Sequence, residues 1–229
     1  MSATHEVFNQ TPPLMDYDAA EYAPILEALQ REGAHDALDE VHRVGRLAGS
    51  EEAQRWGDLA EAHPPVLRTH DRYGHRIDEV EYDPAYHQLM NTAVELGLHG
   101  TPWADPSPHA HLVRAAKLAI WGQVDAGHQC PISMTYAVVP ALRHNPELSA
   151  QYEPLLTTRT YDPRLGAPLT KGGLIAGMSM TEKQGGTDVR AGTTRAVPQA
   201  DGSYLLTGHK WFTSAPMSDI FLVLAQTES

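Results

Sequence analysis

The chain has 229 residues with 41% apolar content, enough for one large or two small globular domains. Its net charge of -12 is uneven, because residues 1–108 hold 7 Lys and Arg against 20 Asp and Glu, whereas residues 109–229 hold 10 against 9. An acidic first half repels nucleic-acid phosphates, which excludes it as a DNA-binding surface. No run of eighteen apolar residues is present, so we expect no membrane span.

The start of the chain is polar and does not resemble a signal peptide. Cys130 is the only cysteine, so no intrachain disulfide can form. Both features fit the reducing cytoplasm, and we expect a cytoplasmic protein.

Helical periodicity dominates the first two thirds of the chain. After an extended arm over residues 1–20, apolar spacing and helix-end signals predict helices over 21–31, 36–48, 51–62, 84–97 and 109–127 and from Pro131 onward. Asp83-Pro84 is a helix-start signal, and Pro140 is expected to bend or end the last helix. The helix over 109–127 has little polar face, which predicts a position inside a bundle. Residues 66–82 read as an ordered surface excursion with room for a short strand.

From Gly173 the period becomes that of strands. We expect strands over 174–180, 193–198, 203–206, 208–213 and 220–225, with Asp201-Gly202 as a hairpin turn. A sheet that stops after an apolar strand has an unpaired edge. We therefore interpret the sequence as a piece of a longer protein.

Two stretches carry groups suited to a planar cofactor with a phosphate tail. Gly185-Gly186-Thr187 can form a nest of N–H groups for a pyrophosphate, although a plain tight turn is the simpler interpretation. Trp211 can stack on a ring while Thr213 and Ser214 bond its edge, although a core tryptophan is the common alternative. The hairpin between the stretches lets both serve one ligand, which favours the functional interpretation.

Other candidate groups are weaker. His109 and His111 stand at a helix start, where residues two apart diverge, so we name no metal ligand. Cys130 before Pro131 could be a nucleophile at a helix N-terminus. A small buried apolar role is the preferred interpretation of Cys130.

These residues also resemble a known family. Met180-Thr181-Glu182, Gly186-Thr187-Asp188 and Lys210-Trp211-Phe212-Thr213 resemble the flavin-binding signature of acyl-CoA dehydrogenases. Lys183-Gln184 follow the glutamate where most of that family has proline, which resembles the AidB branch, as does the stretch Cys130-Pro131-Ile132-Ser133-Met134-Thr135. The resemblance covers essentially the whole chain and corresponds to less than the first half of a full-length member.

The resemblance implies an α+β chain with an acyl-CoA dehydrogenase-like fold. An all-α N-terminal helical domain with its extended arm would span residues 1–172. A truncated antiparallel β-barrel domain would begin at residue 173 and run to 229. It further implies a homotetramer at full length and a C-terminal helical domain beyond this sequence.

The resemblance implies FAD as cofactor and acyl-CoA as a candidate substrate. The strand over Met178, Ser179, Met180 and Thr181 would contact the flavin pyrimidine edge. The pyrophosphate would bind at Gly185, Gly186 and Thr187, and the isoalloxazine would lie against Trp211 with its N5 side near Phe212, Thr213 and Ser214. In the family, a glutamate of the C-terminal domain removes the α-proton and the β-hydride goes to the flavin. No residue here matches that glutamate, so we name no catalytic residue.

Three functions stay open at this point. The AidB-like motif favours a flavoprotein that protects DNA from alkylation, with DNA bound only through the C-terminal domain. The fold alone favours an ordinary dehydrogenase of a short or branched acyl-CoA. A third interpretation is a helical module with weak or no FAD retention, and we expect this piece alone to be inactive.

Overall fold

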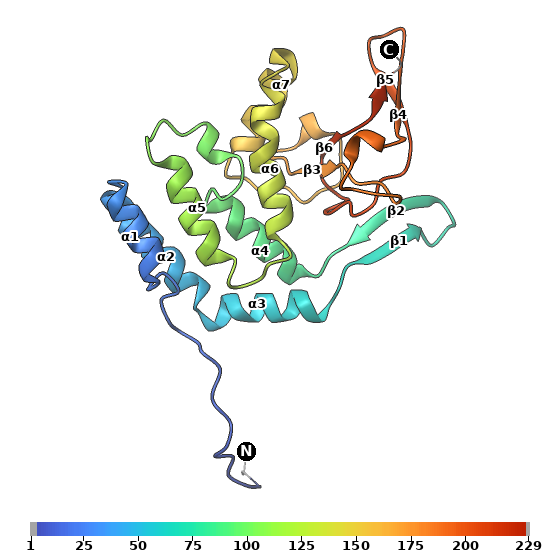
Figure 1. Cartoon of the computed structure of the whole chain (residues 1–229). Helices are drawn as coiled ribbons and strands as arrows, with labels where there is room; N and C mark the ends of the chain where they lie inside the picture. The colour runs from blue at the N-terminus through green and yellow to red at the C-terminus, as the bar shows by residue number, and fades with distance from the viewer. Residues whose placement is uncertain (1–3, 228–229) are drawn as a thin grey trace.

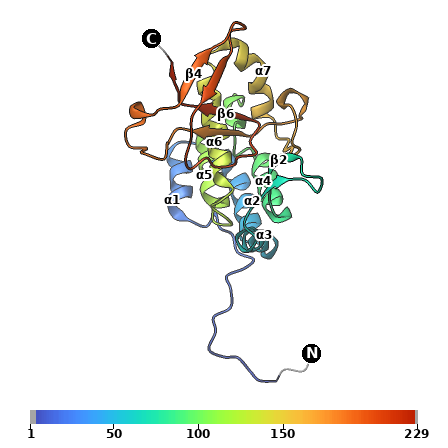
Figure 2. The same cartoon turned by 90° about the vertical axis from the view of Figure 1, so that its right-hand side faces the viewer.

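The computed structural model describes residues 4–227, which form a helical bundle followed by a small β region (Figure 1). The helices are α1 Ala23–Arg31, α2 Leu38–Ala48, α3 Glu51–Ala62, α4 Pro84–Glu95, α5 Ala110–Trp121, α6 Gln129–Leu142 and α7 Pro146–Thr157. Single-turn 3-10 helices lie at His35–Ala37, Thr101–Trp103, Pro168–Thr170 and Val189–Ala191. The predicted extended arm is present over residues 4–15, which run away from the bundle in both views (Figure 2). Residues 16–20 instead pack on the bundle, because Ala19 and Ala20 are buried and the Asp16 N–H donates to the Gly49 carbonyl.

The helix starts follow their sequence signals. The Asp83 carboxylate accepts the Ala85 N–H at 2.8 Å with Pro84 in the first turn, and Ser50 caps α3 by accepting the Ala53 N–H. Pro140 lies inside α6, which ends two residues later at Leu142. The helix α7 was not predicted, although Asn145 caps it and Pro146 opens it.

Most of the core lies between the helices. α2 packs on α5 and α3 packs on α4. The buried side chains include Leu29, Val41, Leu89, Met90, Ile120 and Trp121. One face of α5 is buried in the bundle through Ala116, Ile120 and Trp121, whereas His111, Ala115 and Ala119 are exposed, so the expected burial holds for that face only. None of the helices within residues 4–227 is long and apolar enough to cross a bilayer.

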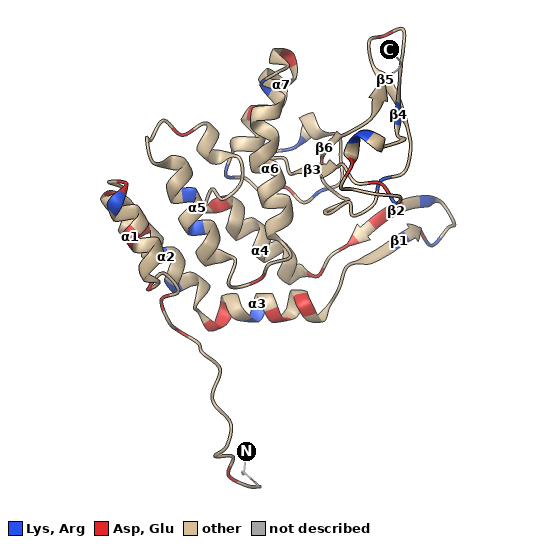
Figure 3. Cartoon of the chain, in the orientation of Figure 1, with Lys and Arg blue, Asp and Glu red and all other residues tan. Residues whose placement is uncertain are grey.

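The surface excursion is a β-hairpin that projects from the bundle. β1 Val66–His70 pairs antiparallel with β2 Arg76–Glu81, with a bulge between Arg68 and His70. The acidic residues of the first half lie largely on the outer faces of the helices, with a run on α3, and along β2 (Figure 3). Most of these carboxylates are exposed to solvent.

The β region is open within residues 4–227 and is not purely antiparallel. β4 Arg195–Pro198 and β5 Tyr204–Thr207 form the predicted antiparallel hairpin. β3 Ala176–Ser179 instead pairs parallel with β6 Ile220–Val223, and β4 pairs parallel with β7 Gln226–Thr227. The expectation of antiparallel pairing was wrong for these two pairs, because long crossover connections separate the partners and allow parallel strands.

The strand expected over residues 208–213 was also wrong. This segment is irregular, and Phe212 and Ala215 have positive φ angles of 59° and 48°. A non-glycine residue with positive φ turns the backbone away from an extended path. The segment therefore folds back toward the end of β3.

A second core joins the bundle to the β region. Val138, Val139 and Leu142 of α6 pack with Leu156 of α7 and with Leu174 and Ala176 at the start of β3. At the centre of this contact, the buried Thr135 hydroxyl accepts the Ala176 N–H at 2.9 Å and donates to the Pro131 carbonyl. The α6 helix thereby fixes where β3 begins.

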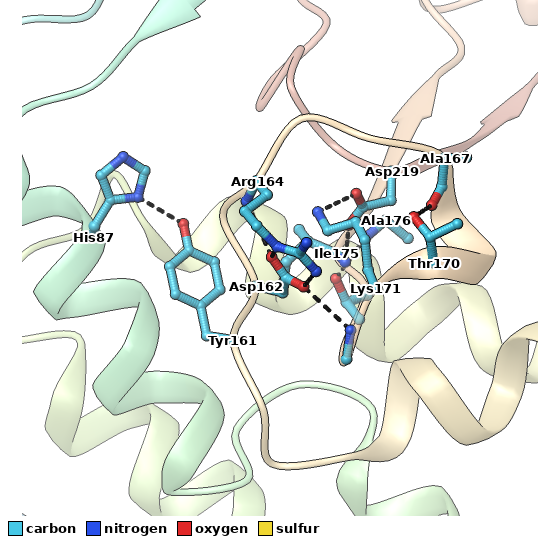
Figure 4. A network of polar contacts seen from close by, with 12 residues as sticks. His87, Tyr161, Asp162, Arg164, Ala167, Thr170, Lys171, Ile175, Ala176 and Asp219 are labelled. Atoms are coloured by element: carbon cyan, nitrogen blue, oxygen red, sulfur yellow. Dashed lines mark hydrogen bonds and ion pairs between the residues drawn. The ribbon is translucent and has the colours of Figure 1, made fainter.

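The linker after α7 is held by polar contacts (Figure 4). Tyr161 bonds His87 of α4 at 2.8 Å. Lys171 forms a buried ion pair with Asp219, whose carboxylate also accepts the Ile175 N–H at 2.8 Å. These contacts tie the linker to α4 and to the residue that precedes β6.

We predict that Thr135→Val destabilises the fold by about 1–3 kcal/mol, because valine keeps the shape but leaves the buried Ala176 N–H unpaired. Urea unfolding measures this change. Thr135→Ser keeps the hydroxyl and should retain most of the stability. Equal losses in the two variants would contradict a role for the hydrogen bond.

Candidate functional site

The two motifs singled out in the sequence lie side by side at the end of β3. The Trp211 N–H donates to the Thr181 carbonyl at 2.9 Å. The hydroxyls of Ser179 and Thr213 lie 3.2 Å apart. Although β6 rather than residues 208–213 pairs with β3, the predicted meeting of the two stretches is present.

The aromatic side chains at this place are exposed to solvent. Trp211 is 42% exposed and Phe212 is 83% exposed, with their rings 5.7 Å apart at 72°. The Lys183 ammonium lies 5.6 Å from the centre of the indole. A core role for Trp211 is therefore wrong, and its ring has a free surface on which a planar ligand could stack.

The glycine stretch forms a tight turn. The Glu182 N–H donates to the Gly185 carbonyl and the Gly185 N–H returns to the Glu182 carbonyl at 3.0 Å. A Cβ on Gly186 would lie 2.9 Å from the Thr181 methyl group, so this position requires glycine. Because the Gly185 N–H is used inside the turn, a phosphate would find its donors at Gly186 and Thr187.

A buried carboxylate holds the site together. Glu182 accepts hydrogen bonds from the N–H and hydroxyl groups of both Thr193 and Thr194, at 2.6 to 2.9 Å. Lys210 adds an ion pair at 3.0 Å, and its ammonium also donates to the Met180 carbonyl. The carboxylate thus connects the turn after β3, the start of β4 and the residue before Trp211.

These contacts also set the ionisation of Glu182. The N–H groups of Thr193 and Thr194, then the Thr194 hydroxyl and Lys210, hold the pKa of the Glu182 carboxyl far below its usual range. From the sequence, Glu182 was considered only as part of the Met180-Thr181-Glu182 motif. Its role as the anchor of the loop was missed, since its partners Thr193 and Thr194, directly before β4, are set by tertiary structure.

A cavity of about 300 Å³ opens next to Ser214 and Ala215. Its walls come from three regions, namely the C-terminal part of α3, the start of α4 and the start of α6; they include Tyr82, Tyr86, His128, Cys130 and Pro131. Cys130 is exposed, so the interpretation of it as a buried apolar residue was wrong. At the first turn of α6 its side chain points away from the core that Ile132 enters.

A second cavity of about 310 Å³ lies behind the same tyrosines. It is lined by Tyr82, Tyr86 and Tyr161 together with the Lys171–Asp219 ion pair shown in Figure 4. Burial raises the pKa of the Tyr86 and Tyr161 phenols, which keeps both as neutral hydroxyls. Neither cavity touches the glycine turn.

A histidine–aspartate pair at the start of α6 was not singled out in the sequence. The Nδ1 atom of fully buried His128 lies 2.8 Å from Asp125 Oδ2. The hydrogen bond from His128 holds the pKa of the Asp125 carboxyl below its usual value. The sequence does carry a signal for this pair, because Asp125 stands three residues before His128 near a helix start.

The remaining histidines considered do not form a metal centre. His109 is the residue before α5, and His111 Nδ1 contacts the Tyr136 hydroxyl at 2.8 Å. Within residues 4–227, no three His, Cys, Asp or Glu side chains gather as a metal site would require.

Comparison with known families agrees with the motifs. Residues 9–163 match the family described as the adaptive response protein AidB N-terminal domain. The chain belongs to the AidB family. Residues 177–229 match the middle domain of acyl-CoA dehydrogenases, so the expected order of helical region and flavoprotein-type β region is confirmed.

Individual relatives support the same family. AidB of Escherichia coli (strain K12) is 44% identical over 98% of this chain and 42% of its own length. Acyl-CoA dehydrogenase family member 11 of Caenorhabditis elegans is 31% identical over 76% of this chain and 28% of its own. The crystal structure of C. elegans ACDH-11 with C11-CoA superposes with a TM-score of 0.82 and 26% identity, over 100% of this chain and 39% of that chain. The chain therefore spans less than half the length of these relatives.

We predict that Glu182 makes the fold acid-sensitive. Because its folded-state pKa is depressed, its contribution to stability is complete above the unfolded-state pKa of about 4.3 and is lost as the pH falls below that value. Glu182→Gln should therefore be less stable than the parent at pH 7 and lose less stability on acidification. Urea unfolding at pH 7 and at low pH measures both effects.

Asp188→Asn is the matched control, because it removes the same charge from an exposed position of the same loop. The control should follow the parent at both pH values. A Glu182→Gln variant that also follows the parent would contradict the role assigned to the carboxylate.

Proposed function

We propose that the chain contributes half of a FAD site, formed by Met178–Thr181, Gly185–Thr187 and Trp211–Ser214. The observation that supports it most directly is the Trp211 N–H to Thr181 carbonyl bond, which places an exposed indole beside a polar strand end. An AidB-family chain with an acyl-CoA dehydrogenase middle domain is the context in which a flavin is expected.

The residues fit such a cofactor in their chemistry. The indole of Trp211 offers a flat apolar face, while the hydroxyls of Thr181, Thr213 and Ser214 offer donors and acceptors for a polar ring edge. Gly186 and Thr187 offer N–H groups and a hydroxyl for a phosphate. Lys183 adds positive charge near the turn, which favours an anionic tail, whereas Glu182 offsets the charge of Lys210.

A bound FAD would supply the acceptor for a hydride. In this arrangement Trp211 fixes the plane of the ring, and Ser179 holds the Thr213 hydroxyl in position through their 3.2 Å contact. The ion pair with Glu182 holds Lys210, and with it the neighbouring Trp211, beside the end of β3. The chain offers no residue that we assign as the base of a dehydrogenation.

The substrate we propose is an acyl-CoA. The cavity of about 300 Å³ beside Ser214 is large enough for a short acyl group and has an aromatic wall formed by Tyr82 and Tyr86. The C. elegans relative was crystallised with an acyl-CoA, C11-CoA. α,β-Dehydrogenation of a short or branched acyl-CoA is therefore the activity we propose for the whole protein.

A second role, protection of DNA from alkylation, is one that we propose on the resemblance to the AidB branch, whose family model is described as an adaptive response protein. We propose that any DNA contact of the whole protein lies outside residues 1–108, because that half carries the excess of acidic residues. Assembly as a homotetramer, a cytoplasmic location and a domain boundary between residues 172 and 173 are further proposals that rest on the resemblance.

We predict that Trp211→Ala weakens FAD binding about tenfold, because loss of ring stacking removes on the order of 1.4 kcal/mol. Titration followed by flavin fluorescence measures the dissociation constant. Tyr73→Ala removes another exposed aromatic, at the tip of the β1–β2 hairpin, and should leave binding unchanged. Equal affinity of the parent and Trp211→Ala would refute the assigned stacking surface.

We predict that the chain does not bind duplex DNA measurably at about 50 mM salt, because its net charge is -12. Fluorescence anisotropy of a labelled duplex tests this. Micromolar binding that weakens steeply with salt would show that a basic surface exists within the chain.

A further inference from the structure

Two cavities of similar size share one wall. The cavity beside Ser214 has a volume of about 300 Å³, and the cavity behind it has a volume of about 310 Å³. Tyr82, Tyr86 and Ala215 are the residues that the two linings have in common. The two spaces are therefore neighbours, divided by two phenol rings and one small side chain.

The two rings of this wall are stacked. Their centres lie 4.3 Å apart and their planes meet at 17°. Burial raises the pKa of the Tyr86 phenol, and neighbouring acidic groups raise it further, namely Tyr161, Tyr82, Asp125 and Cys130. Tyr161 lines the second cavity, whereas Asp125 and Cys130 line the first. The Tyr86 side chain thus stands between groups of the two cavities.

The second cavity has surface that suits an alkyl chain. Most of its charged side chains are paired, as Lys171 is with Asp219 (Figure 4) and Arg68 is with Glu81. Polar groups that satisfy one another need no polar ligand. The lining also contains apolar side chains, namely Val80, Met90, Leu165, Ile175 and Met217.

We propose that Tyr82 and Tyr86 form the end wall of the pocket beside Ser214 and thereby restrict its ligand to a short chain. The extension to acyl groups rests on the proposed acyl-CoA function, which places the acyl group in this first cavity. The stacked rings keep the chain out of the second cavity. The two tyrosines are therefore specificity residues that set the length of the acyl group.

The wall is tested first with primary alcohols, because butanol, hexanol, octanol and decanol need neither FAD nor CoA. Each methylene group that enters a cavity strengthens binding about fourfold. In the parent chain, we expect the affinity to rise with length and then to level off by octanol, where the first cavity is full. Isothermal titration calorimetry measures the dissociation constants.

Opening the wall should move this limit. In Tyr86→Ala, the preference for decanol over hexanol should rise about tenfold above that of the parent, because the chain continues into the second cavity. Tyr86→Phe keeps the ring and should keep the limit. Tyr161→Ala is the matched control, because it enlarges only the second cavity and should also keep the limit.

A methionine resonance shows where the chain lies, because Met90 lines the second of the two cavities and not the first. In protein labelled with ¹³C-methyl methionine, the resonance lost in Met90→Leu assigns this side chain. Decanol should shift the resonance in Tyr86→Ala and not in the parent. A shift of equal size in both, an affinity that rises alike up to decanol in both, or no binding of any alcohol overturns the proposal.

Loss of the Tyr86 ring removes packing, so folding is checked by circular dichroism. Tyr82 is only partly buried and gives a second route, because Tyr82→Ala opens the same wall with less loss of core packing. This variant carries the same expectation as Tyr86→Ala. An unchanged length limit in the folded alanine variants of the pair would show that the stacked rings are not the boundary.

The acyl group is tested last, with butanoyl-, hexanoyl-, octanoyl- and decanoyl-CoA. The parent should gain affinity from butanoyl-CoA to hexanoyl-CoA and none beyond octanoyl-CoA, whereas Tyr86→Ala should favour decanoyl-CoA. Parent affinity that rises up to decanoyl-CoA overturns the length limit on acyl groups. If the parent binds the alcohols with the expected limit but binds no acyl-CoA, the acyl-CoA function fails while the wall stands, so the two failures are distinguishable.

Discussion

The candidate site depends on the Glu182 carboxylate more than on any strand pairing. This single side chain gathers Thr193, Thr194 and Lys210, which come from separate parts of the β region. A buried ion pair is weak evidence for stability by itself, because desolvation offsets much of the attraction. Here four hydrogen bonds from the threonines supplement the ion pair, so the carboxylate is well solvated by the protein. Trp211 stays exposed because the residue before it is anchored inside.

The helical part was largely predictable because its signals are local. Asp83-Pro84 marks the start of α4, and the apolar residues of α5 predict its buried face, although the opposite face is exposed. The β region was less predictable because its pairing is not local. Ala176 pairs with Ile220, and nothing near either residue indicates a parallel partner. The positive φ of Phe212 likewise reflects tertiary contacts, and it removed the strand expected there.

The residues of the candidate site could be chosen from the sequence, but the contacts that position them could not. Hydroxyls, glycines and an indole at Thr181, Gly186 and Trp211 indicate cofactor chemistry from residue types alone. The partners that position them lie elsewhere in the chain, as with Glu182, whose threonine partners directly precede β4. The exposed position of Cys130 was missed because helix phase decides it, and Ile132 rather than Cys130 faces the core.

The junction between bundle and β region explains why cavities gather at one place. Thr135 fixes the start of β3 against α6, and the Lys171–Asp219 pair fixes the residue before β6 against the linker. Both strands of the parallel pair are therefore anchored at their first residues. The segment that leads from Trp211 to Asp219 must cross the gap between these anchors and the aromatic wall of α4. Since its backbone turns at Ala215 rather than filling that gap, space remains on both sides of Tyr82 and Tyr86. A ligand beside Ser214 would thus lie between the ends of α3, α4 and α6 on one side and the segment that carries Ser214 and Ala215 on the other.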